Sequence, residues 1–216
     1  QIALNRPVAI KVLHRLFAHD EVMQARFERE ARRAAGLRHP HIIDILDYAC
    51  EGELCYIVSE FVEGSDLAKI LKENPGPMPP AQAMAYLRQV GEALQFAHQR
   101  NVIHRDIKPS NILIERETGR VVLCDFGLAR MMHDESVVAT MMRPRAPGSP
   151  ACMAPEQCRG GELDGRTDIY SLGVVAYEML VGRNPFIRGP DDTTDAIMYR
   201  HVHESPPDPQ AANPRL

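Results

Sequence analysis

The sequence lacks the features that mark nucleic-acid-binding and zinc-stabilised proteins. It has no cluster of basic residues: the net charge is −4, and lysine and arginine are scattered along the chain. Nucleic acid binding requires a concentrated positive surface, so we expect none. Cys-x-x-Cys pairs are also missing, and the five cysteines are odd in number. This predicts neither a disulfide framework nor a zinc site, and it favours a reducing compartment.

Long apolar runs are absent as well. The most apolar stretch, 172–180, is too short to cross a bilayer and contains Glu178. The first residues show no basic region followed by an apolar run, so we expect no targeting signal there. These absences predict a cytoplasmic location and leave open a membrane anchor beyond Leu216.

What is present is a globular composition, 44% hydrophobic and 25% charged over 216 residues, enough for one or two compact units. The first third is predicted to run strand, helix, strand, strand, at 7–13, 20–36, 42–49 and 54–61, with the last two strands forming a hairpin. Asp20 would cap the helix. Its buried face would consist of apolar residues at helical spacing: Met23, Phe27, Ala31 and Ala34.

The remaining two thirds are predicted to be mainly helical. One helix begins near Pro80 and a second ends at Gly182. Helical spacing predicts their buried faces, which are Met84, Leu87, Gly91, Leu94 and Ala97 in the first, and Ile169, Leu172, Gly173, Ala176 and Leu180 in the second.

Shorter elements complete the prediction. Two strands, at 112–114 and 121–124, flank a turn between the long helices. A third helix, capped by Asp191 or Asp192, reaches about His203.

Three motifs place chemically active side chains at the ends of these elements. Residues 104–111 (HRDIKPSN) put three polar functional groups on one loop. Residues 125–127 (DFG) follow a strand, and Gly127 permits unusual backbone angles. Lys11 lies in a strand at 8–11 (VAIK), where alone it is more simply read as an exposed strand lysine. Its combination with the other two motifs favours a functional role.

Together these motifs resemble the eukaryotic-type, or Hanks-type, serine/threonine protein kinase family. Their residues look more like those of its bacterial members. The matching positions follow the family's order along nearly the whole chain, at Lys11, Glu30, 104–111, 125–127, Ala154-Pro155-Glu156 and Asp168. The resemblance implies an α+β, two-lobed protein-kinase-like fold. It places a partial small lobe with hinge at 1–62 and a partial, mainly helical large lobe at 63–216.

By the same resemblance, both lobes are expected to be incomplete. No Gly-x-Gly-x-x-Gly motif precedes Lys11, which implies an absent hairpin of about 20 to 30 residues, and the family's last helices are absent too. We therefore expect residues 1–216 in isolation to be unstable or weakly active, and the whole gene product to be a working kinase.

The resemblance implies ATP-dependent phosphorylation of serine and threonine hydroxyls on proteins. A phosphoryl group in transfer carries charge on its oxygens, so positioning and countercharge matter most. Asp106 would accept or orient the hydroxyl proton, and Lys108 would place positive charge near the phosphate. Lys11 would hold the α and β phosphates, with Glu30 aiming its ammonium group. Glu28 is the rival for that role, and a surface glutamate is the plainer alternative.

The implied cofactors are ATP and Mg²⁺, for which Asn111 and Asp125 supply hard oxygen ligands. Ser59 would guard the back of the adenine pocket, and its small side chain predicts room for bulky adenine analogues. The other implied nucleotide contacts are the backbones of Glu60 and Val62 to adenine, Ala9 and Leu113 around the ring, and Asp66 to ribose. All of these could instead be ordinary strand and turn residues.

Lys108 favours serine/threonine over tyrosine, because similar kinases that modify serine or threonine carry lysine there. Arg105, beside the catalytic loop's aspartate, implies control by activation-segment phosphorylation, with autophosphorylation through homodimers as one route. Thr140 and Ser136 are the candidate sites, and each could equally be a solvated hydroxyl.

The segment 148–156 departs from the family pattern at two positions. Ser149 stands in place of threonine and keeps the hydroxyl. Cys152 stands in place of an aromatic residue and leaves the packing beneath the substrate in doubt.

Two other functions compete with this interpretation. A pseudokinase would keep the fold as a binding or scaffold module without turnover, but all the charged catalytic groups are present. A small-molecule kinase of related fold is disfavoured by the long segment 128–153, which resembles a peptide-docking activation segment.

Overall fold

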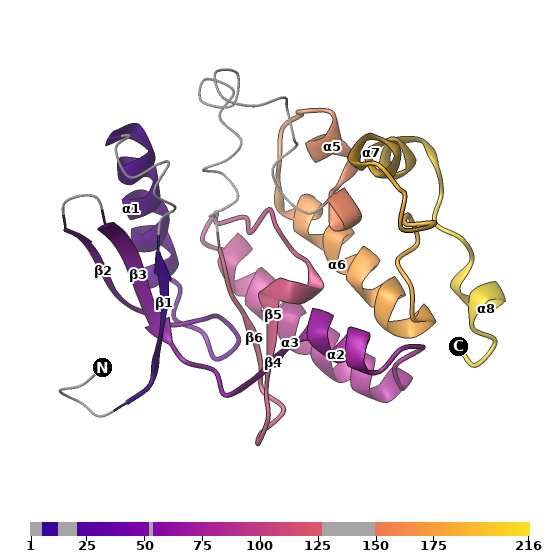
Figure 1. The fold of residues 1–216 in the computed structure, drawn as a ribbon, viewed down its shortest axis with the longest axis horizontal. Helices are drawn as coiled ribbons and strands as arrows, with labels where there is room; N and C mark the ends of the chain where they lie inside the picture. The colour runs from indigo at the N-terminus through magenta and orange to yellow at the C-terminus, as the bar shows by residue number, and fades with distance from the viewer. Residues whose placement is uncertain (1–5, 13–20, 52–53, 127–149) are drawn as a thin grey trace.

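The computed structural model describes residues 6–12, 21–51, 54–126 and 150–216. They form two parts, a small sheet with one helix and a larger, mainly helical part, joined by the segment that follows strand β3 (Figure 1). The predicted two-lobed α+β fold is confirmed. None of the helices within the described ranges is long and apolar enough to cross a bilayer.

The smaller part is an antiparallel sheet covered by one helix. Strands β1 (Val8–Val12), β2 (Ile45–Glu51) and β3 (Leu54–Glu60) pair in the order β1-β3-β2. Helix α1 (Glu21–Ala35) buries Phe27 and Ala31, each 2% exposed, in a cluster with Cys55 and Ile57 of β3. The predicted order of elements and the hairpin are confirmed, because apolar spacing on α1 matches the alternation on β3. The predicted cap Asp20 lies outside the described residues.

The hairpin also corrects the prediction that the cysteines form no disulfide. Cys50 of β2 lies directly opposite Cys55 of β3, with 4.0 Å between their Cα atoms, and the two form a disulfide. A search for spaced cysteine patterns misses this pair, because strand pairing and not sequence spacing brings the two thiols together. The expectation of a reducing compartment loses this support.

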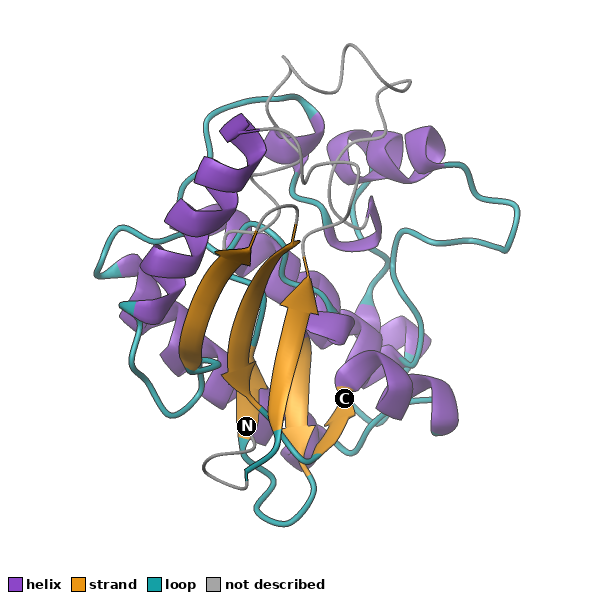
Figure 2. Ribbon diagram, turned by 60° about the vertical axis from the view of Figure 1, so that its left-hand side comes forward, coloured by secondary structure: helices purple, strands orange, loops and turns teal. Residues whose placement is uncertain are grey.

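The larger part combines a second small sheet with helices, and the two sheets are seen from another side in Figure 2. Its sheet has the order β4-β5-β6, with β4 (Gly64–Asp66), β5 (Ile112–Glu115) and β6 (Val121–Leu123). Its helices are α2 (Leu67–Glu73), α3 (Pro80–His98), η3 (Pro109–Asn111), η5 (Pro150–Cys152), α5 (Pro155–Cys158), α6 (Gly165–Val181), α7 (Thr194–His203) and α8 (Pro209–Ala212). Both long helices and the β5–β6 pair were predicted, whereas β4 and α2 were not.

The predicted buried faces of the two long helices are wrong in part. Met84 of α3 is 59% exposed and Ile169 of α6 is 55% exposed. The side chains that α3 buries instead are Ala83, Val90, Ala93, Leu94 and Ala97. Helix α6 lies against α3, η5 and α8, so it buries residues on several sides and no single stripe describes it (Figure 1). Helical spacing identifies one face only when the helix has one neighbour.

The cap of α7 is also corrected. Thr193 caps the helix, since its hydroxyl accepts a hydrogen bond from the Ala196 amide at 3.2 Å. Asp192 is instead held by the guanidinium of Arg200, at 2.6 Å. The competing ion pair, which sequence does not reveal, removes Asp192 from the capping position.

Candidate functional site

The loop between α3 and β5 brings three of the predicted catalytic side chains together. Lys108 Nζ lies 2.6 Å from Asp106 Oδ2, and Asn111 Nδ2 lies 3.1 Å from the same oxygen. The side chains of Asp106 and Lys108 are 15% and 25% exposed, so this contact is screened less than a surface ion pair. A carboxylate held in this way is ready to accept a proton from a substrate hydroxyl.

The amide of Asn111 has a defined orientation. Its Nδ2 donates to the carbonyl oxygen of Asp106 at 2.8 Å and to the Asp106 carboxylate. Both amide hydrogens are therefore used, which leaves Oδ1 as the group available to a cation. Residue 111 ends η3, whose turn is closed by the Asn111 amide bonding to the Lys108 carbonyl at 3.0 Å.

A second charged pair joins the two parts of the molecule. Lys11 of β1 forms an ion pair with Asp125, which follows β6, with 2.8 Å between Nζ and Oδ1. The two side chains are 49% and 34% exposed, so both remain accessible to a ligand. In this arrangement the lysine can bind a phosphate, and the carboxylate can bind a divalent cation.

His104 holds the catalytic loop against the strand that carries Asp125. Its Nδ1 accepts a hydrogen bond from the Asp106 amide at 3.2 Å, so its Nε2 carries the proton and donates to the Cys124 carbonyl at 2.8 Å. The ring is fully buried and packs against Phe126, with 4.6 Å between centroids. The imidazole is thus a structural link and not an accessible base.

Asp168, near the start of α6, anchors the same loop from below. Its Oδ2 accepts hydrogen bonds from the His104 amide at 2.8 Å and from His98 Nε2 at 2.7 Å, and its Oδ1 accepts one from the Arg105 amide at 2.7 Å. The side chain is fully buried, so these three donors compensate its charge. Asp168 belongs to the kinase-like motif set, in which it had no expected role, and the structure shows that it anchors the loop.

The link continues to the segment after η5. Gln157 Nε2 donates to the Arg105 carbonyl at 2.9 Å, and Gln157 Oε1 accepts from the Ala154 amide at 3.0 Å. Gln157 was missed by sequence reasoning, because a glutamine carries no distinctive chemical signal.

Strained backbone occurs at two residues of the site. Arg105 and Asp125 adopt left-handed conformations, with φ of 70° and 67°. Such angles are uncommon outside glycine and cluster at functional sites. We expected special backbone angles at Gly127, which lies outside the described residues.

We predict that replacing His98 with phenylalanine lowers the free energy of unfolding by about 1.5–3 kcal/mol, because buried Asp168 loses a charge-assisted hydrogen bond. An aromatic ring is kept at the position, so little packing is lost. Urea unfolding monitored by circular dichroism measures the change. His203→Phe, at the exposed end of α7, is the matched control, and equal losses in both variants would show that the Asp168 contact contributes nothing.

The residues assigned to adenine and ribose lie around the segment between the two parts. Ala9 pairs with Ser59 across β1 and β3, and Leu113 pairs with Asp66 across β5 and β4. Asp66 has a second task, since its Oδ1 caps α2 by accepting from the Lys69 amide at 2.8 Å. Its other carboxylate oxygen remains for a ligand.

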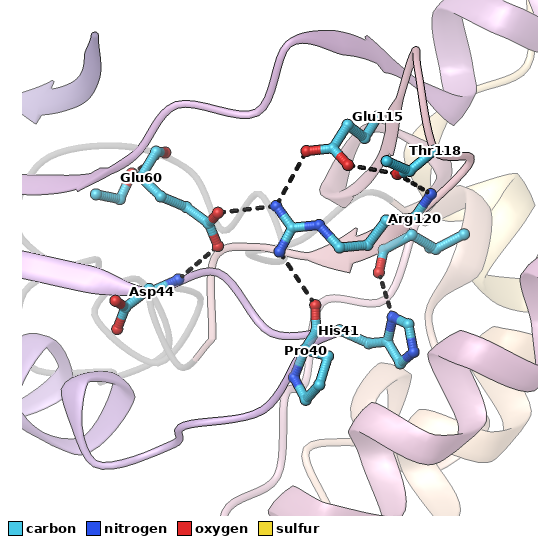
Figure 3. A network of polar contacts seen from close by, with 9 residues as sticks. Pro40, His41, Asp44, Glu60, Glu115, Thr118 and Arg120 are labelled. Carbon is cyan, nitrogen blue, oxygen red and sulfur yellow. Dashed lines mark hydrogen bonds and ion pairs between the residues drawn. The ribbon is translucent and has the colours of Figure 1, made fainter. Parts of the chain in front are cut away.

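The linker residues Glu60 and Val62 are partly buried. Ser59 Oγ donates to the Glu60 carbonyl at 3.3 Å, a long hydrogen bond. The Glu60 carboxylate points toward the guanidinium of Arg120 (Figure 3).

Several predicted residues lie wholly or partly outside the described part of the chain. Glu30 belongs to α1, but its side chain is not described, whereas its rival Glu28 forms an ion pair with Arg32 at 2.6 Å. The activation-segment candidates all lie outside the described residues, namely Thr140, Ser136 and Ser149.

Two free cysteines lie near the site, Cys124 partly buried and Cys152 buried. Burial, together with the neighbouring Asp125 carboxylate, raises the pKa of the Cys124 thiol to about 12. Burial likewise raises the pKa of Cys152 above its ordinary value. Cys152 is 3% exposed and packs into the core, so the aromatic residue expected there is replaced by a well-buried thiol.

The oxygens of Asn111 and Asp125 are suited to Mg²⁺, which prefers few carboxylate ligands together with phosphate and water oxygens. Within the described ranges, no group of three or more histidine, cysteine or acidic residues is placed to hold a metal by itself. This donor set is consistent with a cation that arrives with a phosphate ligand.

Comparisons with known proteins agree on one family. The family model described as the protein kinase domain matches residues 1–213. Serine/threonine-protein kinase PknB of Mycobacterium leprae (strain TN) is 43% identical over 95% of this chain and 32% of its own length. Serine/threonine-protein kinase PrkC of Bacillus subtilis (strain 168) is 38% identical over 100% of this chain and 32% of its own.

A solved structure gives the same result. The PknI kinase domain of Mycobacterium tuberculosis superposes with a TM-score of 0.68 at 28% sequence identity, covering 97% of this chain and 86% of that one. The chain spans about a third of the length of the curated relatives it matches.

Proposed function

The chain belongs to the protein kinase family, and we propose that the protein transfers the γ-phosphoryl group of ATP to serine or threonine hydroxyls of protein substrates. One observation carries the proposal. Asp106, Lys108 and Asn111 form a hydrogen-bonded cluster on one loop. The loop and the Lys11–Asp125 pair are linked through His104.

In this proposal Asp106 accepts or orients the proton of the attacking hydroxyl. Lys108, already 2.6 Å from that carboxylate, supplies positive charge to the phosphoryl group as it transfers. Lys11 holds the α and β phosphates, and Glu30 of α1 orients its ammonium group. These groups act by position and charge and need no covalent intermediate.

Asn111 and Asp125 would hold Mg²⁺ bound to the nucleotide phosphates. When bound, the ion neutralises phosphate charge. The free Oδ1 of Asn111 and the accessible carboxylate of Asp125 support this assignment. In the loaded protein, Lys11 would exchange its contact with Asp125 for one with phosphate.

The adenine ring would lie against the linker, bonded by the backbones of Glu60 and Val62 and enclosed by Ala9 and Leu113. Asp66 would bind ribose through the carboxylate oxygen that does not cap α2. The small side chain of Ser59 supports acceptance of adenine analogues with bulky substituents.

The proposal extends to regulation and organisation. Phosphorylation at Thr140 or Ser136 would control the activation segment, with autophosphorylation through homodimers as one route, and the hydroxyl of Ser149 would bridge Asp106 and Lys108. The lobes would divide at 1–62 and 63–216. We place the activity in the cytoplasm, where ATP is supplied.

The test is phosphate transfer by the full-length protein. With radiolabelled ATP, Mg²⁺ and a general protein substrate such as casein, we expect label on protein, recovered as phosphoserine and phosphothreonine after acid hydrolysis. Binding of ATP without transfer would contradict the proposal and support a scaffold role. Label on phosphotyrosine alone would contradict the assignment of substrate class.

A further inference from the structure

Arg120 joins three segments that are distant in sequence. It precedes β6, at the end of the strand opposite Asp125. Its Nη2 donates to Glu60 Oε2 at 2.9 Å and to Glu115 Oε1 at 3.3 Å, and its Nη1 donates to the Pro40 carbonyl at 3.3 Å (Figure 3). One guanidinium therefore contacts the end of β3, the end of β5, and the segment between α1 and β2.

The partner carboxylate of Glu60 is itself fixed from both sides. Its Oε1 accepts a hydrogen bond from the Asp44 amide at 3.1 Å, while the Glu60 amide donates to the Asp44 carbonyl at 2.9 Å (Figure 3). Glu60 thus binds Arg120 with one oxygen and residue 44 with the other. A side chain with two such partners cannot move without releasing one of them.

The arginine is also held rigidly on its own turn. Thr118 Oγ1 donates to the Glu115 carboxylate and accepts from the Arg120 amide at 3.0 Å. The Glu115 amide in turn bonds to the Arg120 carbonyl at 2.9 Å. These contacts orient Arg120 toward Glu60, so the interaction does not depend on a freely moving side chain.

Both ends of this contact lead into the proposed nucleotide site. Glu60 belongs to the linker whose backbone would bond adenine, and β6 leads directly to Asp125, a proposed cation ligand. The segment at Pro40 is docked on the same strand, because Leu123 bonds to the carbonyl of His41 at 2.9 Å and the Ile43 amide bonds back to Leu123 at 3.0 Å. Arg120 therefore connects the linker to the strand that leads to Asp125.

We propose that Arg120 is a positioning residue for the nucleotide, acting through Glu60 to hold the adenine-binding linker in register with the phosphate-binding end of β6. This inference rests on the proposed function, because it assigns a role to a site that must bind ATP. The side chains of Arg120, Glu60 and Glu115 are 29%, 25% and 24% exposed. At this exposure, water screens the Arg120–Glu60 ion pair less than it screens a fully exposed pair, although the pair still contacts solvent.

The test compares Arg120→Gln with the wild-type full-length protein. Loss of the guanidinium is expected to raise the KM for ATP roughly three- to tenfold, with kcat within about twofold, since the catalytic loop is not touched. Arg120→Lys keeps the charge but cannot contact three partners at once, so an intermediate KM is expected. Arg166→Gln is the matched control, because Arg166 is 89% exposed and pairs with Asp164, two residues before it.

A double-mutant cycle separates positioning from general stability. If Arg120 acts through Glu60, Glu60→Gln raises the KM for ATP similarly, and the double variant is no worse than the more affected single variant. Assays run well below the unfolding midpoint of each variant keep loss of folded protein out of the comparison. Should Arg120→Gln fold poorly, Glu60→Gln alone decides, since it removes the same contact from the other side.

Three results would overturn the inference: an unchanged KM in Arg120→Gln or, if that variant folds poorly, in Glu60→Gln; an equal rise in Arg166→Gln; or additive effects in the double variant. Any of these, in a protein whose wild-type form phosphorylates casein, rejects the role of Arg120 and leaves the proposed function intact. Absence of transfer by the wild-type protein instead rejects the proposed function, and with it the positioning role of Arg120.

Discussion

Asp106→Asn is expected to lower kcat for phosphate transfer by about 10²–10⁴-fold, the range that a positioned general base contributes. Asparagine has nearly the same shape but cannot accept the hydroxyl proton. It also removes the negative charge that lies 2.6 Å from Lys108 and so disturbs the placement of that ammonium group. Initial rates with radiolabelled ATP and casein measure the effect.

The Asp106→Asn experiment requires evidence that ATP still binds. Calorimetric titration with ATP and Mg²⁺ should show a dissociation constant close to that of the wild-type protein, because Asp106 is assigned to the protein substrate and not to the nucleotide. Asp191→Asn, an exposed change outside the site, should leave both rate and binding unaltered. A rate for Asp106→Asn above about a tenth of the wild-type value would exclude the base assignment.

Lys11→Met is expected to lower kcat/KM for ATP by about 10²–10³-fold, the loss typical of removing one preorganised charge from a reacting centre. Methionine has an unbranched side chain of nearly the same length but carries no charge to bind phosphate. Steady-state kinetics over a range of ATP concentrations gives the value, and nucleotide titration shows how much of it is binding.

The same substitution should hardly alter stability. The Lys11–Asp125 pair is half exposed on the lysine side, and pairs of this kind contribute about 0–1 kcal/mol to folding. A large loss of activity with an unchanged unfolding midpoint is therefore the expected signature. Lys69→Met on α2, where the lysine is also exposed, provides the matched control. A Lys11→Met protein with wild-type kcat/KM would remove Lys11 from the mechanism.

The local part of the candidate site could be predicted from the sequence. Asp106, Lys108 and Asn111 lie within six positions of one another, so their proximity follows from the loop itself. The elements that carry them were predicted as well, because the long helix from Pro80 and the short strands have clear start and stop signals. The resemblance to protein kinases added roles that these residue types alone do not specify.

The contacts between distant residues could not be predicted in the same way. Asp168 and His98 are 70 positions apart, and Arg120 and Glu60 are 60 positions apart. An arginine in a turn and a glutamate at a strand end are the commonest of surface residues, and nothing in their spacing distinguishes them. The predicted burial of Met84 was wrong for a related reason, because more than one helical face fits the apolar residues of that helix.

The chemical groups of the site, and the elements that present them, can be read from the sequence: a lysine on a strand, a loop with an aspartate, a lysine and an asparagine, and an aspartate after a strand. These features depend on interactions within a few residues, which the local sequence pattern reflects. Which groups meet became known from the three-dimensional structure, including the Lys11–Asp125 pair, the burial of Asp168 and the Cys50–Cys55 disulfide. The reason is that such contacts are set by the packing of whole elements, and a displacement of a few ångströms between two elements breaks a hydrogen bond without changing a single residue.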